Sequence, residues 1–280
     1  MLKRKSGVKF RTIVEIVPPE WRIDPADSIL CVGSCFAQRI GDAMAVRRMR
    51  VDVNPWGTLY NPASIAIALD DSELSPDIVI VTLGTTHVYE RDGRVVANCQ
   101  KLPASLFTER ELTTDEVVET LASVLERLRS RNPRLRAVLT VSPYRYAKYG
   151  FHGSQLSKAR LLMAVDELTR RLPYSTYFPA YEIVLDELRD YRFYDADMLH
   201  PNQQAVDYIW ERFAETLLSP RCQDFLREME PIRKALAHKP FDPDSDEYKR
   251  FVEEAKRKEQ AVIEKFTHFL TQLNADAHVD

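Results

Sequence analysis

Three side chains from distant parts of the sequence could together carry out nucleophilic catalysis. Ser34 follows the apolar run at residues 28–33, where a buried strand is expected to end and a helix to begin. The N–H groups at a helix N-terminus can stabilise an oxyanion, but a serine hydroxyl is a weak nucleophile until a base takes its proton. Asp197 and His200 are three residues apart, a spacing at which a carboxylate can orient an imidazole within one turn.

Each of these residues also has a structural interpretation. Ser34 could simply cap the helix that follows a tight turn. The Asp-x-x-His spacing is common in surface turns, and here Pro201 follows it at the expected start of a helix. Cys35 is a second candidate nucleophile, but a thiol at the start of a helix that packs on a sheet usually behaves as a small inert hydrophobe.

The surrounding pattern indicates which elements must position these side chains. Buried or partly buried strands are expected at residues 28–33, 50–55, 77–84 and 136–143 and within 174–184, and helices at 37–49, 61–71, 113–133 and 154–172. A hairpin that turns at Asp92 and Gly93 is expected within 87–99. Alternating strands and helices predict an α/β protein with a mostly parallel sheet and helices on both faces, whose sites lie at the carboxyl ends of the strands.

Composition excludes several classes of function. The net charge of −3 gives no reason to expect nucleic acid or an anionic membrane as a partner, and no apolar run is long enough to cross a bilayer. The basic residues 1–11 are expected to form a solvated arm, since they lack the apolar core of a secretion signal. The four cysteines form no Cys-x-x-Cys pair, which favours reduced thiols in the cytoplasm. No nucleotide-binding loop and no metal-ligand cluster occurs, so no cofactor is expected.

The composition changes after residue 219, which suggests an α/β body over residues 1–219 and a charged helical extension over 220–280. A stripe of apolar side chains recurs there at helical spacing: Tyr248, Phe251, Val252, Ala255, Val262, Ile263, Phe266, Phe269, Leu270 and Leu273. Such a stripe must be buried either on the α/β body or against a second chain, and the latter would make the protein a homo-oligomer.

Several sequence blocks, in order, resemble the GSCFA family, a branch of the SGNH/GDSL hydrolase superfamily. The blocks are "GSCFA", "NPWGTLYNP", "VTLGTTHVYE", "TVSPYRYAKYGFHGSQLSKA" and "YFPAYEIVLDELRDYRFYDADMLHPN". The resemblance implies a flavodoxin-like three-layer α/β/α fold with Ser34 as the nucleophile, His200 as the general base and Asp197 as its orienting carboxylate. It also implies an oxyanion hole in which the backbone N–H of Gly57 joins that of Ser34.

The third block departs from the wider superfamily. Most members have Gly-x-Asn-Asp there, and the asparagine amide is the third oxyanion donor, whereas this chain has Thr85, Thr86 and His87 after Gly84. Thr85 or His87 could supply the donor instead. Losing one such donor typically costs about 10²- to 10³-fold in rate, so the departure keeps a non-hydrolytic protein open as an alternative.

Other residues of the matching blocks are candidates for substrate contact: Asn54, Trp56, Tyr60, His87 and Arg145. Arg145 and Lys158 would suit an anionic group on the substrate. The predicted function is that of a serine esterase acting through an acyl-enzyme on a small acyl ester, such as an acetyl ester of a carbohydrate or another polar molecule. Two alternatives remain: an O-acyltransferase that uses the same triad, and a non-catalytic binding or assembly module.

Overall fold

The computed structural model describes residues 11–97, 99 and 102–267 of the chain, so the predicted basic arm lies outside it except for residue 11. Its centre is a five-stranded parallel sheet in the order β2-β1-β3-β7-β8. The strands are β1 (Ile29–Gly33), β2 (Val51–Val53), β3 (Ile78–Leu83), β7 (Arg136–Val141) and β8 (Ser175–Tyr177). Numbered as the chain enters this sheet, the order is 2-1-3-4-5, which is the flavodoxin-like order.

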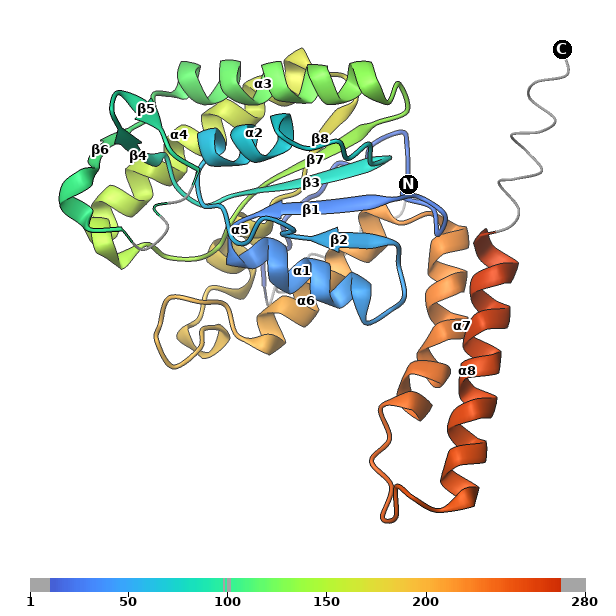
Figure 1. Cartoon of the computed structure of the whole chain (residues 1–280). Helices are drawn as coiled ribbons and strands as arrows, with labels where there is room; N and C mark the ends of the chain where they lie inside the picture. Colours follow the sequence, from blue (N-terminus) through green and yellow to red (C-terminus); the bar gives the residue numbers. More distant parts are fainter. Residues whose placement is uncertain (1–10, 98, 100–101, 268–280) are drawn as a thin grey trace, which may run out of the picture.

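Helices cover both faces of the sheet and complete the predicted three-layer α/β/α fold (Figure 1). One face carries α2 (Pro62–Asp70), α3 (Thr114–Arg131) and α4 (Gly150–Arg171). The other carries α1 (Cys35–Ala45), α5 (Ala180–Glu182) with the π-helical turn Ile183–Leu188, and α6 (Gln203–Leu217). The predicted N-cap Asn61 accepts a hydrogen bond from the N–H of Ser64, and Thr113 and Glu116 form a capping box on α3.

The central strands are buried on both faces, as their continuous apolar sequence predicts. In β1, Leu30 and Val32 belong to the core beneath α2, α3 and α4, while Ile29 and Cys31 belong to the core beneath α1 and α6. All five β1 residues are buried. This fixes the end of the strand, and therefore the backbone that leads into Ser34.

A short parallel bridge joins the start of the body to its end. The N–H of Ile23 donates to the carbonyl of Leu217 at 2.8 Å, and the N–H of Ser219 donates to the carbonyl of Ile23 at 2.9 Å. Ile23 is completely buried. The segment before β1 is therefore attached to the C-terminal end of α6.

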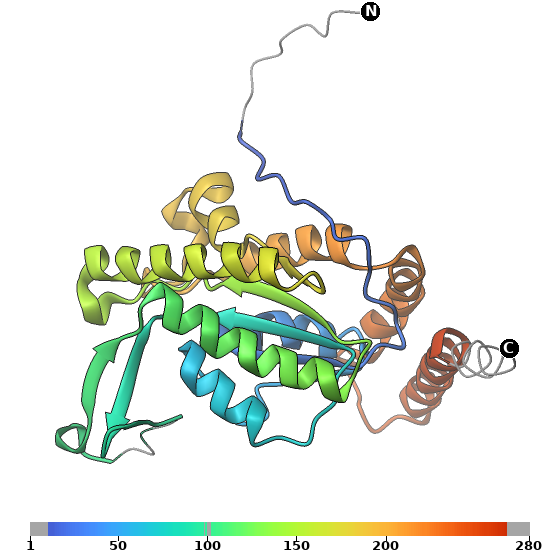
Figure 2. The ribbon, with the colours of Figure 1, turned by 90° about the horizontal axis from the view of Figure 1, so that it is seen from above.

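A second, antiparallel sheet lies at one end of the molecule (Figure 2). It has the order β5-β4-β6 and comprises β4 (His87–Arg91), β5 (Arg94–Val95) and β6 (Thr108–Glu111). The predicted turn at Asp92 and Gly93 joins β4 to β5, which confirms the hairpin. The sequence pattern does not predict β6. Short 3₁₀ turns occur at Ala104–Leu106, Ala147–Tyr149 and Tyr191–Phe193.

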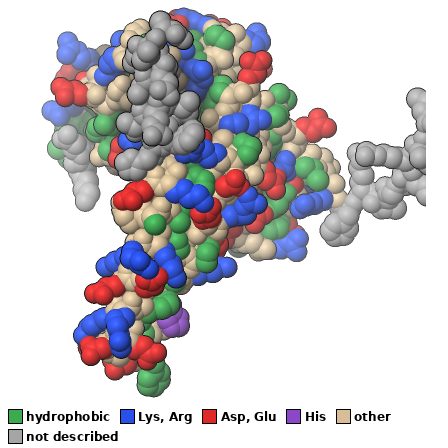
Figure 3. Space-filling model, turned by 90° about the vertical axis from the view of Figure 1, so that its right-hand side faces the viewer, with side chains coloured by type: hydrophobic (Ala, Val, Ile, Leu, Met, Phe, Trp, Pro, Cys, Tyr) green, Lys and Arg blue, Asp and Glu red, His purple; other side chains and the backbone are tan. Residues whose placement is uncertain are grey.

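The C-terminal region contains two helices, α7 (Pro220–Leu236) and α8 (Asp246–Thr267), which form a hairpin that extends away from the sheet (Figure 1). Side chains of the predicted stripe pack on α7; the rings of Phe225 and Phe266, for example, are 5.6 Å apart. Within the described part of the stripe, Ala255 and Phe266 are buried and Phe251 is 44% exposed, so α7 covers the stripe only in part. Phe269, Leu270 and Leu273 lie outside the described residues. Acidic and basic side chains intermix along the hairpin surface (Figure 3). No helix in the described ranges is both long and apolar enough to cross a bilayer.

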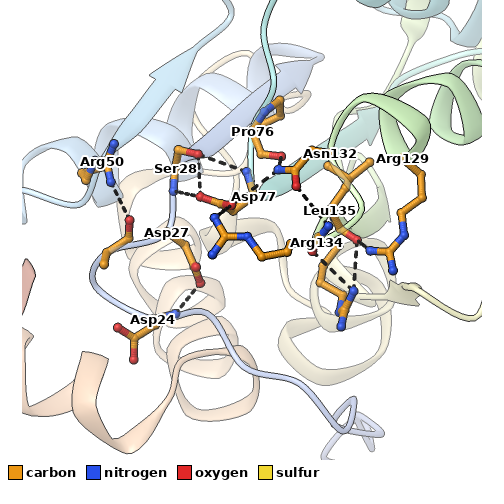
Figure 4. Close-up of polar contacts among 12 residues, drawn as sticks. Asp24, Asp27, Ser28, Arg50, Pro76, Asp77, Arg129, Asn132, Arg134 and Leu135 are labelled. Atoms are coloured by element: carbon orange, nitrogen blue, oxygen red, sulfur yellow. Dashed lines mark hydrogen bonds and ion pairs between the residues drawn. The ribbon is translucent and has the colours of Figure 1, made fainter. Parts of the chain in front are cut away.

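A polar network closes the amino-terminal edge of the parallel sheet (Figure 4). The Asp77 carboxylate accepts hydrogen bonds from the N–H (3.0 Å) and hydroxyl (2.8 Å) of Ser28 and from Arg134 (2.8 Å). Burial alone would raise the pKa of Asp77, but these partners hold it below its usual value. Asp27 lies close by and accepts the N–H of Asp24 at 2.7 Å. Burial, reinforced by the charges of Asp77 and Asp24, raises the pKa of Asp27 to about 6.

Asp27 should therefore make the protein less stable as the pH rises from 4 to 6. The unfolded carboxyl ionises near pH 3.8 and the folded one only near 6, so the stabilisation is complete below the lower value and is lost above the higher one. After allowance for its partial exposure, we expect the loss to be about 2 kcal/mol. Urea unfolding of wild type and Asp27→Asn at pH 4.5 and 7.5 would measure this loss. Relative to wild type, the free energy of unfolding of Asp27→Asn should be higher at pH 7.5 than at pH 4.5 by about this amount. A constant difference between the two proteins would contradict the prediction.

Candidate active site

Asp197 and His200 form a hydrogen-bonded pair in the loop before α6. Asp197 Oδ2 lies 2.5 Å from His200 Nδ1, while Oδ1 accepts the backbone N–H groups of Leu199 (2.8 Å) and His200 (3.0 Å). The backbone N–H and the ring of His200, together with the N–H of Leu199, lower the pKa of Asp197 to about 2. The carboxylate therefore stays ionised and fixes the imidazole through Nδ1, which leaves Nε2 to face another group.

The loop that carries this pair is attached to two elements beside Ser34. Arg145, just after β7, donates from its backbone N–H to the carbonyl of Leu199 (3.1 Å) and from its guanidinium to that of Met198 (2.9 Å). Arg39 of α1 donates to Asp195 at 3.2 Å. Arg145 also stacks over Phe151, at 4.3 Å from the ring centre. Its described contacts thus hold the loop, and the anion-binding role suggested by the sequence has no counterpart among them.

The ring of Tyr144 packs against the histidine, with its centre 4.3 Å from that of the His200 ring. The backbone N–H of Tyr144 donates to Ser142 Oγ at 3.3 Å. Burial and then the neighbouring Cys35 and Asp197 raise the pKa of the Tyr144 hydroxyl. Tyr144 therefore lies within electrostatic reach of the residue that follows Ser34 and of the carboxylate that holds His200.

Ser34 caps α1, as its structural interpretation requires. Its Oγ accepts the N–H of Phe36 at 3.2 Å, and its own N–H donates to the carbonyl of Thr82 at 3.0 Å. No hydrogen bond joins Ser34 to His200, although the structure describes both residues. Ser34 is completely buried. An ester can therefore reach its Oγ only after the surrounding structure opens.

Cys35 is half-buried at the first position of α1, so it is less enclosed than expected. Burial raises the pKa of its thiol, against the opposing charges of Lys158 and Arg39. The thiol is therefore protonated at neutral pH and is a poor nucleophile there.

The turn after β2 differs from the oxyanion arrangement that the resemblance implies. The N–H of Gly57 donates to the carbonyl of Asn54 at 2.7 Å, so in this conformation it is not available to a substrate. Gly57 has φ +81° and Asn54 has φ +42°. Asn54 is buried, and its Oδ1 accepts the N–H of Gly33 at 2.9 Å. Trp56, in the same turn, packs partly buried against the core.

Thr85 is held by hydroxyl groups that leave its own proton unused. Ser157 Oγ accepts from the N–H (2.8 Å) and the hydroxyl (3.1 Å) of Thr86, so its own proton must go to Thr85 Oγ1, 3.2 Å away. Thr85 Oγ1 also accepts the N–H of His87 at 3.2 Å. Both lone pairs of Thr85 are then occupied and its hydroxyl proton remains for a ligand. Ser157, which orients the Thr85 hydroxyl, could not be identified from the sequence, because Thr85 and Thr86 are about 70 residues away from it in the chain.

A cavity of about 320 Å³ lies beside the end of β3. Three of the predicted site residues line it, namely Tyr60, Thr85 and His87, together with further aromatic and polar side chains that include Asn61, Tyr146 and Tyr149. The His87 ring stacks on Tyr149 at 3.4 Å and lies between the carboxylates of Glu109 and Glu111, at 3.6 and 3.3 Å. Burial lowers the pKa of His87 more than Glu109 raises it, so the ring is neutral at pH 7.

Lys158 has a different place from the one expected for a substrate contact. It is almost completely buried, at 2% exposure, and donates to the carbonyls of Gly84 and Ser142, both at 2.7 Å. These carbonyls follow the last residues of β3 and β7. Burial lowers the pKa of Lys158 to about 7. The side chain thus links the ends of two neighbouring strands. Within residues 11–97, 99 and 102–267, no three His, Cys, Asp or Glu side chains gather as metal ligands would.

Comparison with known proteins finds two family models that match this chain. A model described as "GSCFA family" matches residues 28–75 and 73–213, and one described as "GSCFA domain protein, C-terminal domain" matches residues 229–275. No curated protein matches the chain.

Similar solved structures include an acetylxylan esterase from Geobacillus stearothermophilus, with 13% identity, TM-score 0.47 and coverage of 71% of this chain and 100% of that one. Another is an α/β hydrolase enzyme from the metagenome of Lake Arreo, Spain, with 12% identity, TM-score 0.47 and coverage of 70% and 96%. Since the first family model spans more than half of the sequence, the chain belongs to the GSCFA family.

Proposed function

We propose that this protein is an SGNH-type serine ester hydrolase with Ser34 as nucleophile, His200 as general base and Asp197 as the carboxylate that orients it. The proposal rests above all on the 2.5 Å contact between Asp197 and His200. That pair lies in a loop attached to α1, the helix that Ser34 caps. An ionised carboxylate on Nδ1 is what a histidine needs in order to accept a proton at Nε2.

In the proposed reaction, Ser34 Oγ bonds to the acyl carbon while His200 Nε2 takes the hydroxyl proton. The tetrahedral oxyanion then collapses, and the leaving alkoxide takes that proton from His200. A water molecule, deprotonated by His200, then attacks the acyl-serine. When this second tetrahedral intermediate collapses, Ser34 Oγ leaves and takes the proton back from His200, and the carboxylic acid is released. An alcohol in place of this water would give the alternative reaction, O-acyl transfer.

For the oxyanion we propose the Thr85 hydroxyl as a donor, because, with Ser157 donating to Thr85, its proton has no acceptor among the residues that the structure describes. The backbone N–H groups of Ser34 and Gly57 could join it only after leaving the carbonyls of Thr82 and Asn54. A side-chain donor already in place costs no such rearrangement.

The substrate we propose is a small acyl ester, such as an acetyl ester of a carbohydrate or another polar molecule. The cavity beside β3 is of a size for one small polar group, and tyrosine rings and hydroxyls line it. Tyr60 and His87 are the substrate contacts we propose within it. The four free cysteines favour a cytoplasmic protein, and we propose no nucleic-acid or membrane partner.

Labelling with a fluorophosphonate tests this function, since the reagent bonds to activated serines. We expect the probe to modify wild type and Cys35→Ala but not Ser34→Ala, and peptide mapping to find the adduct on Ser34. Because the side chain is buried, the incubation should extend to hours. A folded wild type that stays unlabelled would favour the binding module, and loss of labelling in Cys35→Ala would favour the thiol.

A further inference from the structure

We infer that the side-chain amide of Asn54 donates a hydrogen bond to the oxyanion formed during attack by Ser34, in the place where the N–H of Gly57 was expected. This inference rests on the proposed function. It gives a catalytic role to a residue that the sequence suggested only as a general substrate contact.

The amide of Asn54 is buried with both of its N–H donors unused. The residue is 7% exposed, and Oδ1 accepts the N–H of Gly33 at 2.9 Å. Nδ2 has no hydrogen-bond partner among the described residues. A buried N–H₂ group without a partner costs folding free energy, so its retention calls for an explanation.

The amide is also fixed beside the nucleophile. The backbone N–H of Asn54 donates to the carbonyl of Cys31 at 2.9 Å, and Oδ1 then takes the N–H of Gly33. The side chain thus extends the β1–β2 ladder by one residue, to the position directly before Ser34. Because Oδ1 is held by Gly33, the orientation of Nδ2 is set by the strand that ends at the nucleophile.

The turn that carries Asn54 also occupies a backbone donor. Asn54 has φ +42°, in the left-handed region that asparagine adopts more readily than other non-glycine residues. The same turn directs the N–H of Gly57 onto the carbonyl of Asn54 at 2.7 Å. The backbone N–H of Gly57 is therefore occupied, whereas the side-chain N–H₂ group of Asn54 is not. A side-chain amide is also the kind of oxyanion donor that the third sequence block lacks.

Asn54→Asp tests the inference with little change in shape. The carboxylate still accepts the N–H of Gly33, but it has no proton to donate and repels the oxyanion. We expect kcat for p-nitrophenyl acetate to fall by about 10²- to 10³-fold with KM within about threefold of wild type. The affinity for a boronic acid, which forms a tetrahedral anion on the serine, should fall by a similar factor. A merely structural role would not produce this parallel loss.

Two further variants make the result decisive. Asn54→Gly removes the amide and relieves the positive φ, so it should lose activity without depending on the added charge. Asn132→Asp makes the same amide-to-carboxylate change at the opposite edge of the sheet and should leave kcat unchanged. If Asn54→Asp and Asn54→Gly both keep kcat and boronate affinity within threefold of a wild type that depends on Ser34, this inference alone is wrong. If wild-type activity does not depend on Ser34, the proposed function fails and the inference fails with it.

Discussion

His200→Ala should lower kcat for ester hydrolysis by about 10⁶-fold, and Asp197→Asn by about 10⁴-fold. Without the imidazole nothing takes the Ser34 proton. An asparagine can still accept the N–H groups of Leu199 and His200, but its N–H₂ group toward Nδ1 favours the wrong tautomer of the ring. The ionised carboxylate also stabilises the imidazolium that forms during attack, which the amide cannot do.

Steady-state hydrolysis of p-nitrophenyl acetate with each variant would measure these losses. Both side chains are partly exposed and lie in a loop, so the unfolding temperature should stay within a few degrees of wild type. His238→Ala, in the segment after α7, is the matched control and should retain full activity. Asp197→Asn activity within tenfold of wild type would show that Asp197 does not orient the base.

Lys158 should make the folded protein more stable as the pH rises from 7 to 9. Its pKa is about 7 when folded and 10.5 in the unfolded reference, so over this range the unfolded chain binds the extra proton. Its contribution is complete above the unfolded value and lost as the pH falls through the folded one. Two pH units correspond to roughly 2–3 kcal/mol. The neutral amine still has two N–H groups, enough for the carbonyls of Gly84 and Ser142.

Urea unfolding of wild type and Lys158→Met at pH 7, 8 and 9 would measure this contribution. The difference between the two free energies of unfolding should widen by about 2 kcal/mol in favour of wild type, because cysteine titration affects both proteins alike. Lys148→Met, which changes an exposed lysine nearby, should follow the wild-type pH dependence. A gap that does not change with pH would mean that Lys158 keeps its proton throughout.

Local sequence signals were enough to predict the layers of the fold. Continuous apolar runs predicted β1, β3 and β7, and the caps Asn61 and Thr113 marked the starts of α2 and α3. The strand β6 was missed because its sequence, Thr-Glu-Arg-Glu, has no apolar pattern and its pairing with β4 depends on distant residues. The helical spacing of the apolar stripe predicted α8, which carries all of its described residues.

The candidate site was only partly predictable. The spacing of Asp197 and His200 is local, and the structure contains their hydrogen bond. Three other features depend on how separate atoms meet in the folded chain. They are the hydrogen bond from the N–H of Gly57 to the carbonyl of Asn54, the unpartnered side-chain N–H₂ of Asn54, and the contact between Thr85 and Ser157. Single-sequence patterns carry no information about such pairs. The burial of Ser34 also depends on how distant segments pack around it, and the local motif does not encode that packing.

The bridge between Ile23 and the end of α6 can form only after most of the chain has been synthesised. Ser34 leaves the ribosome early, whereas the loop with His200 and the Leu217 carbonyl that holds Ile23 come from the last third of the chain. Contacts between such distant segments carry a large loop-closure entropy and form late. A nascent chain that stops before residue 197 therefore carries Ser34 without Asp197 or His200, and on the proposed mechanism it has no esterase activity until the loop with His200 has been translated.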